Sequence, residues 1–221
     1  YDPFIDLPPG LMSSGEFTPD GDHLAFSFTN PQTAGDVYSI NIANSNMKRW
    51  TFSEIGGLKT EEFVFPELIK YETYDEVDGK PRKIPAFYYK PKGEGPFPVV
   101  VYLHGGPEAQ FHPYFISTFQ YWVKELGIAV LAPNVRGSAG YGKSYLKLDN
   151  AYKRENSVKD AGRILDWIEK QPELDENKVA SYGGSYGGYM SLAMMTHYNE
   201  RLAAGVDIVG ISNFVTFLKN T

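Results

Sequence analysis

The sequence has 221 residues, a formal net charge of −6 and no cysteine. The lack of cysteine excludes disulfides and thiolate chemistry, and an acidic balance without a basic block argues against nucleic acid as a partner. No apolar run reaches the length of a membrane span, so we expect no membrane partner, and a cysteine-free chain fits a reducing, cytoplasmic location. The chain starts at Tyr1 with no initiator methionine, which indicates the interior of a longer protein.

Residues 1–60 predict a small antiparallel sheet followed by a connector. Short β-rich runs alternate with turns, and in residues 37–42 the apolar Tyr38, Ile40 and Ile42 alternate with Ser39 and Asn41. About forty residues with four strands is the size of one β-propeller blade, which needs neighbouring blades to bury both faces. A free-standing antiparallel sheet is the alternative.

Residues 61–221 predict most of an α/β sheet domain. Two β-rich runs flank Asp78 and Gly79, a hairpin signal that supplies an antiparallel edge. Beyond them, strands alternate with helices, which indicates βαβ units and a mostly parallel sheet. We expect strands at residues 97–103, 128–132, 178–182 and 204–209, and helices at 115–126, from a capping box at 157–160 onward, and at 186–198.

The pattern G-x-S-x-G, from Gly183 to Gly187, lies between a predicted strand and a predicted helix. This order is typical of a nucleophile elbow, in which Ser185 stands on a sharp turn that needs small neighbours. The helix N-terminus behind it offers free N–H groups to developing negative charge. A glycine-rich turn with an incidental serine is the alternative.

A second motif, His104-Gly105-Gly106-Pro107, follows the buried strand at residues 97–103. Because parallel strands end at the same edge of a sheet, this loop and Ser185 are expected to meet. We predict that the backbone N–H groups of Tyr186 and Gly106 form an oxyanion hole, with His104 bracing the loop through hydrogen bonds. A tight turn without function is the alternative for the two glycines.

A serine nucleophile needs a histidine base held by an acid, and none of the four histidines suits this role. His23 is expected at the surface of the first domain, and His112 in an exposed loop. His104 belongs to the loop itself, and His197 lies three helical turns beyond Ser185. The usual order of Ser, then acid, then His places both missing groups after residue 221, so we expect a fragment that lacks the acid and base.

Two charged residues have competing interpretations. Asp207 lies in a predicted strand too early for the triad acid, and we expect a buried structural aspartate or a pocket-lining residue. Arg136 follows a buried strand, where it either contacts substrate or anchors its loop by pairing with a carboxylate. No pattern predicts a metal site or a cofactor.

Three motifs are notable together: His104 to Pro107, the run from Asn134 to Gly142, and Gly183 to Met190. They resemble the prolyl oligopeptidase family of serine peptidases, in its acylaminoacyl-peptidase and dipeptidyl-aminopeptidase-like branch. The resemblance implies an α/β-hydrolase domain, here incomplete, preceded by a single β-propeller-like blade. It also implies Ser185 as nucleophile and Tyr186 and Gly106 as oxyanion donors. The prolyl-cleaving branches carry a tyrosine where this chain has His104, which puts cleavage after proline in doubt.

The resemblance implies that the full-length parent hydrolyses short peptides or acyl-peptides through an acyl-enzyme at Ser185, while the fragment alone is inactive. A carboxylesterase of the same fold and a non-catalytic interaction module stay open as alternatives. A homo-oligomer is also left open.

Overall fold

The computed structural model describes residues 7–220, which form two compact units. Among the described residues, the first unit takes in 7–66 together with 112–121, and the second takes in 67–111 and 122–220. The domain boundary expected after residue 60 stays a prediction. No helix in this described part is long and apolar enough to cross a membrane.

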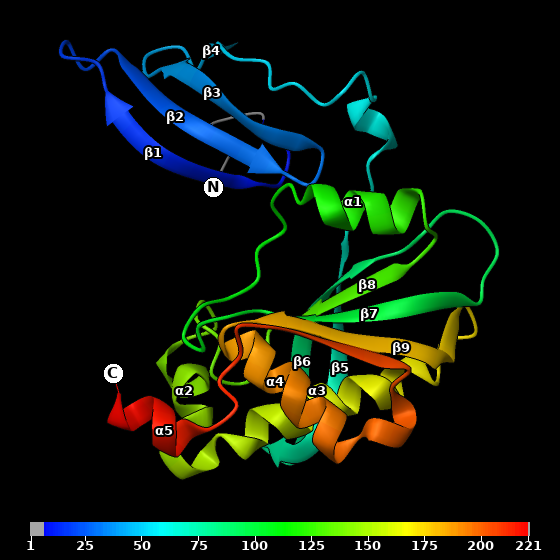
Figure 1. The fold of residues 1–221 in the computed structure, drawn as a ribbon. Coiled ribbons are helices and arrows are strands. Elements are labelled where there is room, and N and C mark those ends of the chain that lie inside the picture. Colours follow the sequence, from blue (N-terminus) through cyan, green and yellow to red (C-terminus); the bar gives the residue numbers. More distant parts are fainter. Residues whose placement is uncertain (1–6, 221) are drawn as a thin grey trace. The chain divides into compact units, whose positions relative to one another are not determined.

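The first unit contains a four-stranded antiparallel sheet in the order β1-β2-β3-β4 (Figure 1). Phe26 and Phe28 from β2 pack with Tyr38 and Ile40 from β3, which confirms the alternation expected there. Ile42 lies beyond β3 and is exposed. The bounds are β1 Leu11–Phe17, β2 His23–Asn30, β3 Thr33–Asn41 and β4 Met47–Arg49, with the 3₁₀ turn η1 at Thr60–Glu62.

The second unit contains a six-stranded sheet in the order β10-β9-β7-β8-β6-β5. The first four strands in this order are parallel, and β6 and β5 add an antiparallel edge. Asp78 and Gly79 form the β5–β6 turn with φ of 53° and 71°, which confirms the expected hairpin. The bounds are β5 Glu67–Val77, β6 Lys80–Tyr89, β7 Phe97–Leu103, β8 Ala129–Pro133, β9 Leu174–Gly184 and β10 Ala204–Ile208.

Helices α3 and α4 lie on the same side of this sheet (Figure 1). Their apolar side chains, such as Ile164 and Met190, join Val99, Val101 and Leu131 of the central strands in one core. The residues that directly follow β7 and β9, which include His104 and Ser185, lie beyond the ends of these strands. The helices are α1 Ser117–Lys124, α2 Lys143–Leu146, α3 Glu155–Ile168, α4 Tyr186–His197 and α5 Phe214–Lys219, with 3₁₀ turns η2 Lys147–Asp149, η3 Ala151–Lys153 and η4 Asn199–Arg201.

The capping box expected at residues 157–160 is wrong. Helix α3 begins earlier, at Glu155, and the Ser157 hydroxyl donates to the carbonyl oxygen of Arg154 at 2.7 Å. Asp160 is fully buried and accepts hydrogen bonds from Arg136 instead of capping the helix. The Asp160 carboxylate, which the local pattern assigned to the start of the helix, therefore forms a long-range ion pair with Arg136.

Candidate active site

Ser185 stands at the sharp turn between β9 and α4. Its backbone has φ 56° and ψ −120°, a region that costs a non-glycine residue about 1–3 kcal/mol. Its neighbours must be small, because a Cβ at Gly183 would overlap the Gly187 carbonyl, and a Cβ at Gly187 would overlap the Leu103 carbonyl. The strained turn leaves Ser185 exposed while Tyr186 behind it is buried.

Backbone hydrogen bonds fix this turn on both sides. The Ser185 N–H donates to the Ile208 carbonyl of β10 at 2.9 Å, and the Tyr189 N–H donates to the Ser185 carbonyl at 3.1 Å. Tyr186 is the first residue of α4, so its N–H has no acceptor within the helix. The arrangement presents a hydroxyl and a free helix N–H at adjacent positions.

The loop after β7 lies against this turn. A Cβ added to Gly105 would come 3.3 Å from the Gly184 carbonyl oxygen and 3.6 Å from the Ser185 Cβ. Gly106, Ser185 and Tyr186 all line one cavity of about 1110 Å³. The structure thus brings together the nucleophile and the two oxyanion donors that the sequence predicts, while their roles stay predictions.

The cavity combines an apolar wall with two charged side chains, Arg154 and Glu155. The guanidinium of Arg154 lies 5.0 Å from the centre of the Tyr186 ring and 5.6 Å from that of Phe214, within the range of cation–π attraction. Glu155 Oε1 accepts a hydrogen bond from the Tyr189 hydroxyl at 3.3 Å. The remaining lining side chains are mostly apolar or aromatic and include Pro107, Tyr152, Ile211, Phe217 and Leu218.

The Tyr186 side chain is held beneath the turn by buried polar groups that the sequence analysis missed. Its hydroxyl lies 3.1 Å from Ser157 Oγ and donates to Asp149 Oδ2 at 3.4 Å. Burial raises the pKa of Asp149, although the nearby Arg154 opposes this. These contacts join residues 29 and 37 positions apart, so no local pattern could have revealed them.

His104 has both ring nitrogens engaged. Nδ1 lies 2.7 Å from the Gly105 carbonyl oxygen, and Nε2 lies 2.8 Å from Ser138 Oγ. A carbonyl oxygen only accepts, so Nδ1 carries a proton. Burial lowers the pKa of His104, although the Gly105 hydrogen bond opposes this, and the neutral ring then accepts from the Ser138 hydroxyl. His104 thus contacts both its own loop and Ser138, while its role in bracing the loop stays a prediction.

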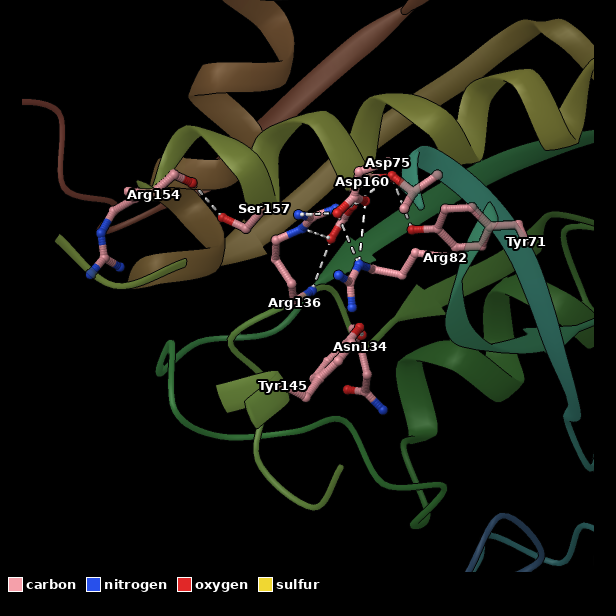
Figure 2. A network of polar contacts seen from close by, with 10 residues as sticks. Tyr71, Asp75, Arg82, Asn134, Arg136, Tyr145, Arg154, Ser157 and Asp160 are labelled. Carbon is pink, nitrogen blue, oxygen red and sulfur yellow. Dashed lines mark hydrogen bonds and ion pairs between the residues drawn. The ribbon is translucent and has the colours of Figure 1, made fainter. Parts of the chain in front are cut away.

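Arg136 is buried in the network drawn in Figure 2. It binds Asp160 through Nε at 2.8 Å and through a terminal nitrogen at 2.7 Å, and it binds Asp75 at 2.7 Å. Burial alone would lower the pKa of Arg136, but these carboxylates raise it above its usual value. Arg136 is absent from the cavity lining. Of the two interpretations, the observed contacts are those of a loop anchor.

The other three histidines have contacts or surroundings of their own. His23 Nε2 contacts Asn41 at 3.3 Å within the first unit, and His197, the last residue of α4, pairs with Glu155 at 3.5 Å. His112 is half-buried, not exposed as expected. No histidine lines the cavity at Ser185 among residues 7–220. The described residues therefore place no histidine base at this cavity.

The environment of Asp207 differs from the one expected. It is exposed on β10 and absent from the cavity lining, so the expectation of a buried or pocket-lining aspartate is wrong. Its Oδ1 accepts the Gly210 N–H at 2.8 Å, which fixes the loop after β10. Within the described residues, no three His, Asp or Glu side chains are grouped to hold a metal ion.

Comparisons with known proteins agree with this geometry. The family model described as "Prolyl oligopeptidase family" matches residues 113–221. Dipeptidyl aminopeptidase BIII of Pseudoxanthomonas mexicana is 40% identical over 130 residues, which are 58% of this chain and 18% of that protein. The uncharacterized peptidase YuxL of Bacillus subtilis (strain 168) is 29% identical over 220 residues, which are 96% of this chain and 32% of that protein.

Solved structures extend the similarity to the fold. A chain from a structural study of two prolyl endopeptidases superposes with a TM-score of 0.81 at 25% identity, covering 93% of this chain and 30% of that one. The fold is thus an α/β-hydrolase sheet preceded by a propeller-like blade. The chain spans between 18% and 32% of the length of the two curated relatives above.

Proposed function

We propose that this chain belongs to the prolyl oligopeptidase family, whose model matches residues 113–221, and that it carries the nucleophile of a serine peptidase that hydrolyses short peptides through an acyl-enzyme at Ser185. The observation that carries the proposal is the elbow itself. Ser185 is exposed at φ 56° on the wall of a cavity that it shares with the first N–H of α4 and with Gly106. Such a turn is strained, and strain of this kind is retained where function needs it.

The chemistry follows from these positions. The Ser185 Oγ attacks the carbonyl carbon of the scissile bond, and the carbonyl oxygen takes on negative charge. When this intermediate collapses, the C–N bond breaks, the amine leaves with the proton given up by Ser185, and water then hydrolyses the ester on Ser185. The N–H groups of Tyr186 and Gly106, together with the positive end of the α4 dipole, stabilise that oxyanion. Removing one such donor in other serine hydrolases costs about 10²–10³ in kcat. These donors are backbone groups, so they need no side-chain rearrangement during the reaction.

The proton of Ser185 must pass to a base that the described residues do not place at the cavity. We propose that a histidine and its acid outside these 221 residues complete the site in the full-length protein. The two nitrogens of His104 are occupied by Gly105 and Ser138, so this ring is not available as the base.

The substrate class follows from the cavity and the family. A volume of about 1110 Å³ with a largely apolar wall suits a few residues of peptide. The curated relatives named above include a dipeptidyl aminopeptidase. We propose short peptides or acyl-peptides as substrates.

The test measures hydrolysis of dipeptide p-nitroanilides and of p-nitrophenyl esters by the full-length protein and its Ser185→Ala variant. We expect amide turnover that Ser185→Ala lowers by at least about 10³-fold, because the nucleophile is lost. Turnover of esters without amides would favour a carboxylesterase. Amide turnover that survives Ser185→Ala would overturn the assignment.

A further inference from the structure

The run from Asn134 to Ser138 contains a serine that the proposed chemistry does not use. Ser138 is 1% exposed, and its hydroxyl has one side-chain partner among the described contacts, Nε2 of His104 at 2.8 Å. The other nitrogen of that ring contacts the Gly105 carbonyl oxygen at 2.7 Å. Ser138 is therefore connected through one imidazole to the loop that lies against Ser185.

We propose that Ser138 is a positioning residue: by donating to Nε2 it keeps His104 protonated at Nδ1, and His104 then orients the Gly105–Gly106 peptide toward the cavity. The proposal rests on the proposed function, because it concerns the oxyanion donor of that site.

The first step is the choice of tautomer. A neutral imidazole has one N–H donor and one acceptor nitrogen, and the partner of one nitrogen decides the state of the other. The Gly105 carbonyl can only accept, while the Ser138 hydroxyl can donate. With Ser138 donating to Nε2, the proton stays on Nδ1, where it meets the Gly105 carbonyl. If Nε2 carried the proton, two lone pairs would face each other at 2.7 Å.

The second step is the orientation of a peptide plane. In a planar trans peptide, the C=O of one residue and the N–H of the next point in opposite directions. The Gly105 carbonyl is fixed toward His104, so the Gly106 N–H must point away from that ring. Gly106 lines the cavity that contains Ser185, whereas His104 does not. Anchoring the carbonyl thus directs the donor into the cavity.

The anchor is needed because glycines alone do not fix this plane. Gly106 has φ +135°, a conformation that only glycine adopts easily, and Gly105 has no side chain to restrict rotation. The loop that carries Ser138 is itself fixed, because Arg136, two residues away, binds the buried Asp160 (Figure 2). These residues therefore act in series. The Arg136–Asp160 ion pair fixes the loop that carries Ser138, Ser138 binds His104, and His104 holds the peptide that carries the Gly106 N–H.

The test is a double-variant cycle in the full-length enzyme with Ser138→Ala, His104→Asn and both together. Asparagine keeps an N–H donor at the place of Nδ1 but has no second nitrogen whose tautomer Ser138 could set. We expect Ser138→Ala to lower kcat by about tenfold or more with KM unchanged, less than full loss of an oxyanion donor. In the His104→Asn background, the same change should have no further effect on kcat.

The matched control is Ser191→Ala. Ser191 is also 1% exposed and its hydroxyl contacts one buried hydroxyl, Ser181 Oγ, at 2.8 Å, and none of the hydrogen bonds found among residues 7–220 joins its side chain to the loop at His104. It should lose similar stability and keep kcat. Equal kcat losses from Ser138→Ala in both His104 backgrounds, or no loss in either, would overturn the proposal.

A spectroscopic arm separates this proposal from the proposed function. The ¹⁵N shifts of the His104 ring report its tautomer without any turnover. We expect protonation at Nδ1 in the wild type and a mixture of tautomers in Ser138→Ala. A wild-type ring protonated at Nε2 would refute the role of Ser138, even if Ser185 proved to be the nucleophile. Activity that survives Ser185→Ala would instead refute the proposed function and leave this spectroscopic result standing.

Discussion

Arg136 is held by two carboxylates that differ in burial, and this difference gives a quantitative prediction. Asp160 is fully buried and accepts three hydrogen bonds from Arg136, at 2.7–3.0 Å, and one from Thr73 at 2.6 Å. The Asp75 side chain is 30% exposed and accepts hydrogen bonds from both Arg136 and Arg82. Breaking a buried pair costs about 3–5 kcal/mol, because the remaining charge is left without its partner in a dry site.

We therefore expect Asp160→Asn to lower the free energy of unfolding by about 3–5 kcal/mol. The matched variant Asp75→Asn should cost about 1 kcal/mol or less, because water reaches this half-buried position and Arg136 keeps its pair with Asp160. Both substitutions keep the side-chain shape, and each removes one negative charge that faces the Arg136 guanidinium. Burial alone would raise the pKa of Asp75, but Arg136 and Arg82 hold it below its usual value, so Asp75 is ionised at neutral pH.

The assay is urea unfolding at pH 7, followed by circular dichroism, with the midpoint and slope of each variant fitted separately. A loss for Asp160→Asn that is several times the loss for Asp75→Asn supports the reasoning. Equal losses would show that burial does not decide the strength of this pair and would refute it.

Two further predictions concern the loop and the elbow. Because the pKa of His104 is lowered in the folded protein, the unfolded chain binds more protons below about pH 6.5, so the free energy of unfolding should fall as pH drops through that value. The variant His104→Asn should remove this part of the pH dependence, as measured by urea unfolding at a series of pH values. Gly187→Ala should destabilise by more than about 2 kcal/mol in the same assay, because its Cβ would overlap the Leu103 carbonyl. Gly184→Ala, whose Cβ would have no atom closer than 3.7 Å, should cost about 1 kcal/mol or less, and similar losses for the two glycines would contradict the packing argument.

The elements that the sequence predicted are those with strong local patterns. The alternation around Tyr38 and Ile40 identified β3, and the apolar run of β7 indicated a strand covered on both faces. The hairpin at Asp78 and the start of α4 at Tyr186 were also found, since turn glycines and helix formers act over a few residues.

The contacts that the sequence did not predict join residues far apart in the chain. Asp160 looked like part of a helix cap, but its partner Arg136 lies 24 residues away. Ser138 and His104 are 34 residues apart, and nothing in either motif indicates which nitrogen the serine meets. The polar groups under Tyr186 were missed for the same reason. Local patterns find the nucleophile, whereas the groups that position it depend on the tertiary fold.

The central claim is that Ser185 is the nucleophile, and site mapping of a covalent adduct tests it most directly. The full-length protein is treated with a fluorophosphonate, digested and analysed by mass spectrometry. We predict one adduct, on Ser185, which Ser185→Ala abolishes and which Ser191→Ala leaves intact. An adduct on another serine, or an unlabelled protein that still hydrolyses peptides, would contradict the account.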